Sequence, residues 1–260
     1  MKRSYFIIGI TFLFLLIGKS ALSGNSLLFL GDDDFPPYSY QENGRLLGID
    51  VEIIEEMAKR LNIDITIKLV PWKRLIKMTQ DGQCDGSFSL FHTKKRENFA
   101  FYAFSQPIHV SRFPLFFKKD KKIQFNTIED LYGKTIGINR GFSISEAFDA
   151  AVEQGKIIVN IENEVDENIV LTANNSIHGF TNNYDVTKYK IKNIPRLKQY
   201  KKTILHSQKS ISDLRNAYVV LSKKTQNIQN KAEMIQRINQ TLTEMKNDGF
   251  YLKLNNQYLE

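Results

Sequence analysis

The chain has 260 residues, of which 42% are hydrophobic, and a formal net charge of +8 at pH 7. Its basic residues are dispersed in pairs such as Lys118-Lys119 and Lys201-Lys202, and are not concentrated on one element, so binding to nucleic acid is not expected. The only cysteine is Cys84, which excludes an internal disulfide. A chain of this length can bury a large core without one.

The N-terminus has the features of a secretory signal peptide. Lys2 and Arg3 precede an apolar run from Tyr5 to Ile17, and Ala21-Leu22-Ser23 supplies small residues for a signal peptidase. A retained membrane anchor is the alternative, but the run is shorter than the roughly 20 residues that span a bilayer. We therefore predict export to the periplasm, with cleavage near Ser23–Gly24. Cleavage removes three basic residues and leaves 33 against 28 acidic ones, a net charge of +5.

The first part of the mature chain alternates extended and helical patterns. Leu27–Leu30 is a short apolar strand before an acidic, proline-containing loop. Asn43-Gly44 predicts a tight turn, and Asp50 is the predicted N-cap of a helix that reaches Leu61. The elements expected next are a strand at Ile63–Val70, a helix around Lys73–Thr79, a strand at Cys84–Leu90 and a β-rich segment at Val110–Lys118.

A second alternating unit follows the charged break at Lys118–Lys122. Thr127 caps a short helix at Ile128–Leu131, and Ser143 and Glu146 have capping-box spacing, which predicts a helix that begins near Ser143. The other expected elements are strands at Thr135–Ile138, Ile157–Ile161, Ile177–Thr181 and Tyr218–Ser222, a helix near Asp166–Ala173, and a long amphipathic helix from Ile228 to Met245. This alternation predicts an α/β fold.

Catalytic and metal-binding patterns are weak in this sequence. The four histidines, at positions 92, 109, 178 and 206, show no metal-ligand spacing. Neither GxSxG, nor a phosphate loop, nor GxGxxG occurs, and Cys84 is expected to be a buried, inert thiol. The run Asp32–Asp34 lacks the spaced oxygen ligands of a calcium loop. We therefore expect no enzyme, no cofactor and no metal site.

Residues suited to ligand binding lie at strand ends. Phe35, Tyr38 and Trp72 stand beside prolines, where aromatic side chains either face a cleft or pack in the core. Arg96 follows a strand-to-helix transition, where a guanidinium can bind a carboxylate through two parallel hydrogen bonds, although a solvated helix arginine is the alternative. The loop from Arg140 to Ser143 offers a positive helix start to an anion.

Several motifs, taken in order, resemble one known family. They are Phe35-Pro36-Pro37-Tyr38 with Gly48-Ile49-Asp50-Val51, Trp72, Gly82–Gly86, Thr93–Arg96 with Phe101–Pro107, Asp130–Ile138 and Asp248–Tyr251. The chain is similar to the bacterial extracellular solute-binding proteins that serve polar-amino-acid uptake by ABC transporters. The resemblance covers essentially the whole mature chain.

The resemblance implies a two-lobed α/β fold of the Venus-flytrap type, with a mixed sheet flanked by helices in each lobe and two hinge strands. The implied division is a signal peptide at 1–23, lobe 1 at 24–113 and 219–260, and lobe 2 at 114–218. The implied ligand-binding residues are Asp32, Phe35, Tyr38, Trp72, Ser89, Arg96, Arg140, Ser143 and Asn183. In the family pattern, Arg96 pairs with a ligand carboxylate, and Phe35 and Trp72 enclose its apolar part.

The function implied by the resemblance is capture of a small, polar, carboxylate-bearing solute by a monomer that delivers it to a membrane permease. A sensory binding protein that engages a membrane receptor, and a dehydratase-type enzyme, are the alternatives. Asp32, His92 and His178 are the candidate acids or bases of such an enzyme. His178 and Asn183 stand where the family usually has acidic residues, so the partner of a ligand ammonium is missing from the pattern.

Overall fold

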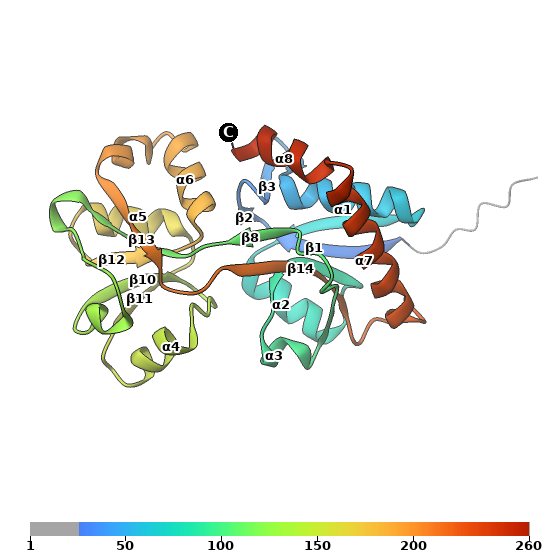
Figure 1. The fold of residues 1–260 in the computed structure, drawn as a ribbon, viewed down its shortest axis with the longest axis horizontal. Helices are drawn as coiled ribbons and strands as arrows, with labels where there is room; N and C mark the ends of the chain where they lie inside the picture. The colour runs from blue at the N-terminus through green and yellow to red at the C-terminus, as the bar shows by residue number, and fades with distance from the viewer. Residues whose placement is uncertain (1–25, 260) are drawn as a thin grey trace, which may run out of the picture.

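The computed structural model describes residues 26–259, and the predicted signal peptide lies outside the described residues. The chain forms two α/β lobes joined by two neighbouring strands, as Figure 1 shows. This arrangement confirms the predicted two-lobed fold. No helix within residues 26–259 is long and apolar enough to cross a membrane.

Lobe 1 is built on a six-stranded sheet. Its strands are β1 (Leu27–Asp32), β5 (Ile65–Val70), β6 (Gly86–Phe91), β7 (Ala100–Tyr102), β8 (His109–Ser111) and β14 (Arg215–Ser222). The order is β5-β1-β6-β14-β7, with β8 also paired to β14. Strand β1 is parallel to β5 and β6, whereas β14 is antiparallel to its three neighbours. A three-stranded sheet of β2 (Asp34–Phe35), β3 (Ser39–Glu42) and β4 (Arg45–Leu47) lies beside it. The tight turn predicted at Asn43-Gly44 joins β3 to β4, and both residues have positive φ.

The helices of lobe 1 are α1 (Ile49–Leu61), α2 (Trp72–Asp81), α3 (Lys94–Glu97), α7 (Lys231–Asn247) and α8 (Phe250–Leu259). Ile53, Ile54 and Met57 of α1 are fully buried, and α1 contacts both α7 and α8. The predicted cap of α1 is wrong, because Gly48 is the N-cap and Asp50 lies buried in the first turn. Gly48 has φ 123°, and a Cβ there would lie 2.3 Å from the carbonyl oxygen of Tyr38, so only glycine fits this position.

Lobe 2 is built on a five-stranded sheet in the order β11-β10-β12-β9-β13. Its strands are β9 (Pro114–Lys118), β10 (Thr135–Asn139), β11 (Ile158–Glu162), β12 (Gly179–Thr181) and β13 (Ile204–Ser210). Its helices are α4 (Glu146–Glu153), α5 (Val165–Ala173) and α6 (Tyr184–Asn193), with 3₁₀ turns η1 (Lys119–Lys121), η2 (Ile128–Leu131) and η3 (Lys198–Lys202). Thr127 and Asp130 form the capping box of η2, at the place where the sequence predicts a cap.

The cores of the two lobes are rich in phenylalanine. Phe29 and Phe88 are fully buried in lobe 1. In lobe 2, Phe116 and Phe180 stack with their ring centroids 4.9 Å apart across the antiparallel pair β9–β12. These buried aromatic cores hold each sheet in place, so the loops at the strand ends start from fixed positions.

The polypeptide passes between the two sheets at residues 112–113 and 211–214. The single segment predicted at Val110–Lys118 is therefore two strands, β8 in the sheet of lobe 1 and β9 in that of lobe 2. Strand β14 begins at Arg215, before the predicted start at Tyr218, and pairs with β8 next to the crossing. The two crossings lie side by side in the middle of Figure 1.

Candidate functional site

The carboxyl ends of the central parallel strands in both lobes border a common cleft. In lobe 1 these ends carry Asp32 on β1 and Phe91 on β6, and in lobe 2 they lead to Arg140 after β10 and Asn182 after β12. Open α/β sheets bind ligands at the carboxyl edge of their strands, because the connecting loops there diverge and leave a crevice. The cleft is therefore the candidate functional site.

One part of the cleft, here called the inner cavity, has an empty volume of about 380 Å³, which includes space open to solvent. It is lined by Asp32, Phe35, Trp72, Ser89, Phe91, Arg96, Phe142, Ser143 and Arg215. Six of the nine predicted binding residues belong to this set: Asp32, Phe35, Trp72, Ser89, Arg96 and Ser143. The structure thus brings together side chains that the sequence separates by more than a hundred positions.

A wider part of the cleft, the outer cavity, measures about 950 Å³ and shares four wall residues with the inner cavity. The shared residues are Asp32, Phe35, Trp72 and Phe142. Arg140, also predicted, lines this outer part, where its Nε donates to Asn163 Oδ1 at 2.9 Å. Trp72 of lobe 1 meets Phe142 of lobe 2 edge to face, with ring centroids 6.3 Å apart, so an aromatic residue from each lobe separates the two parts.

Arg96 is held in place by the short helix α3 and by an aromatic ring. Thr93 caps the helix and accepts a hydrogen bond from Arg96 N at 3.3 Å. The guanidinium donates from Nη1 to the carbonyl oxygen of Phe91 at 2.7 Å and lies 5.0 Å from the centre of the Trp72 ring. Within the described residues Arg96 forms no ion pair with a carboxylate, and burial lowers its pKa. Most of its N–H donors are therefore available to a ligand in the inner cavity.

Arg215, at the start of β14, lines the inner cavity, although no sequence motif identified it as a binding residue. Its Nη1 donates to the carbonyl oxygen of Ser143 in lobe 2 at 2.5 Å, and its guanidinium lies 4.4 Å from the centre of the Phe91 ring. Burial and the positive charge of Arg96 lower the pKa of Arg215 to about 10. Only the return of β14 alongside the sheet of lobe 1 brings this residue to the cavity.

Ser89 connects the cavity wall to a buried acid–base pair. Its backbone has φ 65°, an uncommon value for serine, and its Oγ donates to Asp50 Oδ2 at 2.5 Å. Asp50 also contacts His109 Nδ1 at 2.8 Å. The aspartate lies between the serine and the histidine, so His109 does not take the proton of Ser89 as the base of a serine nucleophile would. The network instead fixes the orientation of Ser89.

Two predicted residues, Tyr38 and Asn183, line neither part of the cleft. The Tyr38 hydroxyl donates to Asp185 Oδ2 at 2.8 Å, and its ring stacks on His109 with centroids 3.9 Å apart. Asn183 caps α6 through Val186 N and donates from Nδ2 to Ser111 Oγ at 2.6 Å. Both side chains connect the two lobes or lie at the crossing between them, and both already form hydrogen bonds within the protein.

The histidines considered as acids or bases lie away from the cleft. His178 is exposed before β12, at the end of that strand opposite Asn182, and accepts from Thr135 N at 3.0 Å. His92 is exposed and contacts Glu97 at 2.5 Å. His178, which stands where the family usually has an acidic residue, is therefore not part of the cavity wall.

The helix predicted to begin at Ser143 begins later, at Glu146, with Ser145 as its N-cap. Ser143 Oγ instead donates to Asp149 Oδ2 at 2.8 Å, and Ser145 Oγ accepts from Phe148 N. The correct cap is Ser145 because its side chain reaches the free amide three residues on, whereas Ser143 lies in a loop that follows Gly141 with φ 81°. Ser143 still lines the inner cavity, but the predicted anion site of a helix start is not formed there.

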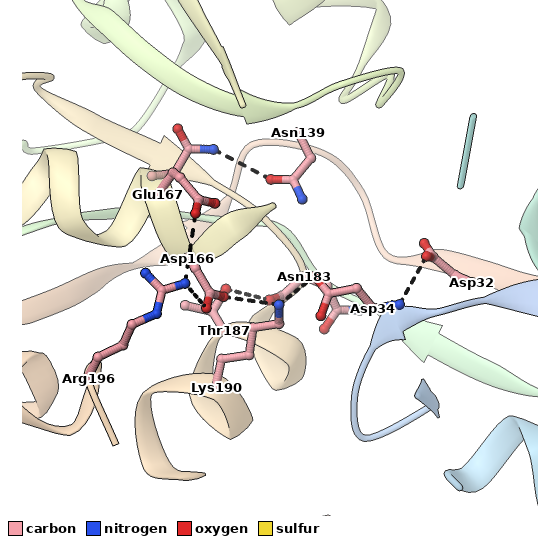
Figure 2. Close-up of polar contacts among 10 residues, drawn as sticks. Asp32, Asp34, Asn139, Asp166, Glu167, Asn183, Thr187, Lys190 and Arg196 are labelled. Atoms are coloured by element: carbon pink, nitrogen blue, oxygen red, sulfur yellow. Dashed lines mark hydrogen bonds and ion pairs between the residues drawn. The ribbon is translucent and has the colours of Figure 1, made fainter. Parts of the chain in front are cut away.

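A chain of ion pairs crosses the cleft next to the outer cavity, as Figure 2 shows. Lys190 of α6 is 1% exposed, and its Nζ lies 2.5 Å from Asp34 Oδ2 of lobe 1 and 3.0 Å from Asp166 Oδ1 of lobe 2. Arg196 contacts the other oxygen of Asp166 at 2.7 Å. Although burial opposes the charged form of Lys190, these carboxylates raise its pKa. The cluster joins the two lobes.

Asp32 should make the stability of the protein depend on pH. Burial raises the pKa of its carboxyl from 3.8 to about 7, and Asp33 and Asp34 add to this rise, whereas the Asp34 N–H and Lys190 oppose it. The folded protein therefore keeps a proton that the unfolded chain releases, and its free energy of unfolding falls as pH rises from about 4 to 7.

We expect Asp32→Asn to remove this dependence. Between pH 4.5 and 8, the stability of the variant relative to the wild type should rise by roughly 2 kcal/mol, less than the full shift would give, because water reaches the cavity. Urea unfolding at the two pH values measures the change. Asp33→Asn, which alters a half-buried neighbour, is the control and should show a much smaller change. Equal pH dependence in Asp32→Asn and the wild type would contradict the expectation.

Comparison with known proteins agrees with this architecture. The family model described as "Bacterial extracellular solute-binding proteins, family 3" matches residues 27–260. The "Probable amino-acid-binding protein YxeM" of Bacillus subtilis is 26% identical over 226 residues, which cover 85% of this chain and 79% of that protein.

Two solved structures share the fold. A histidine kinase sensor domain with similarity to periplasmic binding proteins has a TM-score of 0.75 at 18% identity, over 90% of this chain and 96% of that one. An ancestral arginine-binding protein bound to arginine has a TM-score of 0.74 at 20% identity, over 90% and 98%. With the family model matched over nearly the whole described chain, the protein belongs to the bacterial extracellular solute-binding proteins of family 3.

Proposed function

We propose that this protein captures a carboxylate-bearing solute, an amino acid or a related acid, in the inner cavity and delivers it to an ABC-type importer. The observation that carries the proposal is the guanidinium of Arg96, which lacks a carboxylate partner among residues 26–259 and faces an aromatic cavity between two lobes. A planar guanidinium binds a carboxylate through two parallel hydrogen bonds. The proposed place of action is the periplasm, and the proposed form is a monomer.

The division of the cavity wall between the lobes explains how binding would be signalled. Asp32, Trp72 and Arg96 belong to the sheet of lobe 1 or its loops, whereas Phe142 and Ser143 belong to lobe 2. A solute can touch both sets only when the cleft is closed, so its binding energy favours the closed state. An importer could then distinguish the loaded protein from the empty one by shape.

A sensory role is the second candidate, and the likeness to the histidine kinase sensor domain favours it. Both roles use the same closure, so the binding step that we propose is common to them. An enzymatic role finds less support, because Asp32 is the only one of the three candidate acids or bases that lines the inner cavity. Recovery of the bound solute unchanged after prolonged incubation would separate binding from turnover.

The test is calorimetric titration of the ligand-stripped protein with amino acids and simple carboxylic acids. We expect binding of at least one such acid, and Arg96→Gln should weaken it roughly 30- to 100-fold, because hydrogen bonds to a charged group are lost. Arg74→Gln is the matched control, since Arg74 is an exposed arginine on α2 that lines neither cavity. Unchanged affinity in Arg96→Gln, or no binding of any acid, would contradict the proposal.

A further inference from the structure

The inner cavity contains two arginines where the proposed function needs one. Arg96 approaches from α3 and Arg215 from the start of β14, and both line the same space. Each guanidinium lies over an aromatic ring, Arg96 over Trp72 at 5.0 Å and Arg215 over Phe91 at 4.4 Å. Rings in these positions restrict where the planar groups can lie, so both cations are held in place before any solute arrives.

Neither of these cations is neutralised by an ion pair with a carboxylate in the described part of the chain. Two other arginines do form such pairs: Arg60 contacts Glu56 and Asp248, and Arg196 contacts Asp166. Two like charges in a half-buried aromatic space repel each other and lose hydration, which is costly unless an anion compensates them. The arrangement is therefore poor for stability and suited to an anion.

The acidic residue in the cavity wall compensates this charge only in part. Among residues 26–259, Asp32 is the one acid that lines the inner cavity, and burial raises its pKa to about 7. Below that pH Asp32 is mostly neutral and does not offset the charges of the two guanidinium groups, whereas above it the carboxylate offsets about one of them. Asp149 accepts a hydrogen bond from Ser143 and does not line the cavity, but its negative charge acts on Arg215 and offsets the charge of that residue in part.

We propose that Arg215 is a second anion-binding residue, and that the preferred solute carries two carboxylates, one for Arg96 and one for Arg215. The inference rests on the proposed function, because it assigns the class of solute to the same site. The apolar walls Phe35, Phe91 and Phe142 enclose the short carbon chain that separates the two acid groups. Arg215 also donates to Ser143 of lobe 2, so binding at this residue acts where the lobes meet.

A purely structural role for Arg215, as a bridge between the lobes through Ser143, is the competing explanation. The two roles differ in selectivity. A bridge affects all solutes alike, whereas an anion-binding residue distinguishes a dicarboxylate from the same molecule with one carboxylate replaced by an amide. The amide keeps size and shape and removes a single negative charge.

The experiment is calorimetric titration of the full protein with glutamate against glutamine, and aspartate against asparagine. In the wild type we expect at least one diacid to bind roughly 10- to 100-fold more tightly than its amide, as for a lost charged hydrogen-bond partner. Arg215→Gln should bring this ratio close to one with little change in the affinity for the amide. Arg215→Lys, which keeps the charge and is the milder change, should give an intermediate ratio.

Arg112→Gln is the matched control, because Arg112 stands at the other crossing, lies 3.7 Å from the centre of the Tyr184 ring and lines neither cavity. It should leave the diacid-to-amide ratio unchanged. If diacids and amides bind equally in the wild type, or if the ratio survives in both Arg215 variants, the inference is wrong while the proposed function stands. If none of the four compounds nor any other acid binds, both are wrong.

Discussion

Replacement of Lys190 by methionine is expected to lower the free energy of unfolding by about 3 kcal/mol at pH 7. The ammonium lies 2.5 Å from Asp34 and 3.0 Å from Asp166, and the side chain is almost completely buried. Methionine fills a similar volume, so the loss comes from carboxylates that no longer face a cation. Removal of one partner of a buried ion pair costs about 3–5 kcal/mol. The lower value applies because Asp166 keeps its ion pair with Arg196, and because the side chain of Asp34 is 37% exposed.

Urea unfolding of Lys190→Met measures this loss, and Lys192→Met is the matched control. Lys192 lies on the same helix but is exposed, and its replacement should change stability by less than about 0.5 kcal/mol. The double variant Lys190→Met, Asp34→Asn should recover part of the loss, because it also removes one of the unpaired charges. Equal stability of Lys190→Met and Lys192→Met would show that the interlobe ion pair contributes nothing.

Asp50→Asn should lower the free energy of unfolding by about 2–4 kcal/mol. The Asp50 carboxylate is fully buried and accepts from Ser89 Oγ at 2.5 Å while it contacts His109 Nδ1 at 2.8 Å. Asparagine keeps the shape but removes the negative charge and presents an NH₂ group to one of these partners, so that hydrogen bond must reverse its direction or is lost. Because Ser89 lines the inner cavity, the affinity for the solute should fall as well.

Urea unfolding and calorimetric titration of Asp50→Asn test both effects. Asp64→Asn is the control, because Asp64 is exposed in the loop before β5 and should tolerate the change. Stability close to that of the wild type would mean that the network adapts to an amide, and Ser89 would then not depend on Asp50 for its orientation.

Much of the candidate site could be predicted from the sequence because its motifs resemble a family whose residues of this kind lie at the ends of strands. Trp72 follows a predicted strand, and the resemblance to the family implied Asp32 and Ser89; in a parallel sheet, positions at strand ends meet at one edge. The structure places all three in the inner cavity. Tyr38 and Asn183 occupy similar positions in the sequence but bond to Asp185 and Ser111 instead, and local pattern cannot distinguish a side chain that faces a cleft from one that joins two lobes.

Helices were predictable where one face is apolar. The apolar spacing of α1 identified the helix, although its start was misplaced because Asp50 is a favoured N-cap and its burial could not be foreseen. The sequence did not predict α6, whose buried face includes Thr187 and Lys190 beside Val186 and Ile191. A lysine on a buried face breaks the apolar pattern, and only the carboxylates that surround it in the folded protein make that burial favourable.

The order of motifs along the chain determined the family, the α/β class and the identity of the strand-end residues, because these depend on local spacing and on a regular sheet. The tertiary structure alone decided which charges meet. Three pairs of charged or polar residues are far apart in sequence and come together only through strand order and lobe closure. They are Arg96 with Arg215, Lys190 with Asp34, and Asp50 with His109. Coulomb energy depends on the distance between charges, and desolvation depends on burial. Neither distance nor burial can be deduced from the order of residues along the chain.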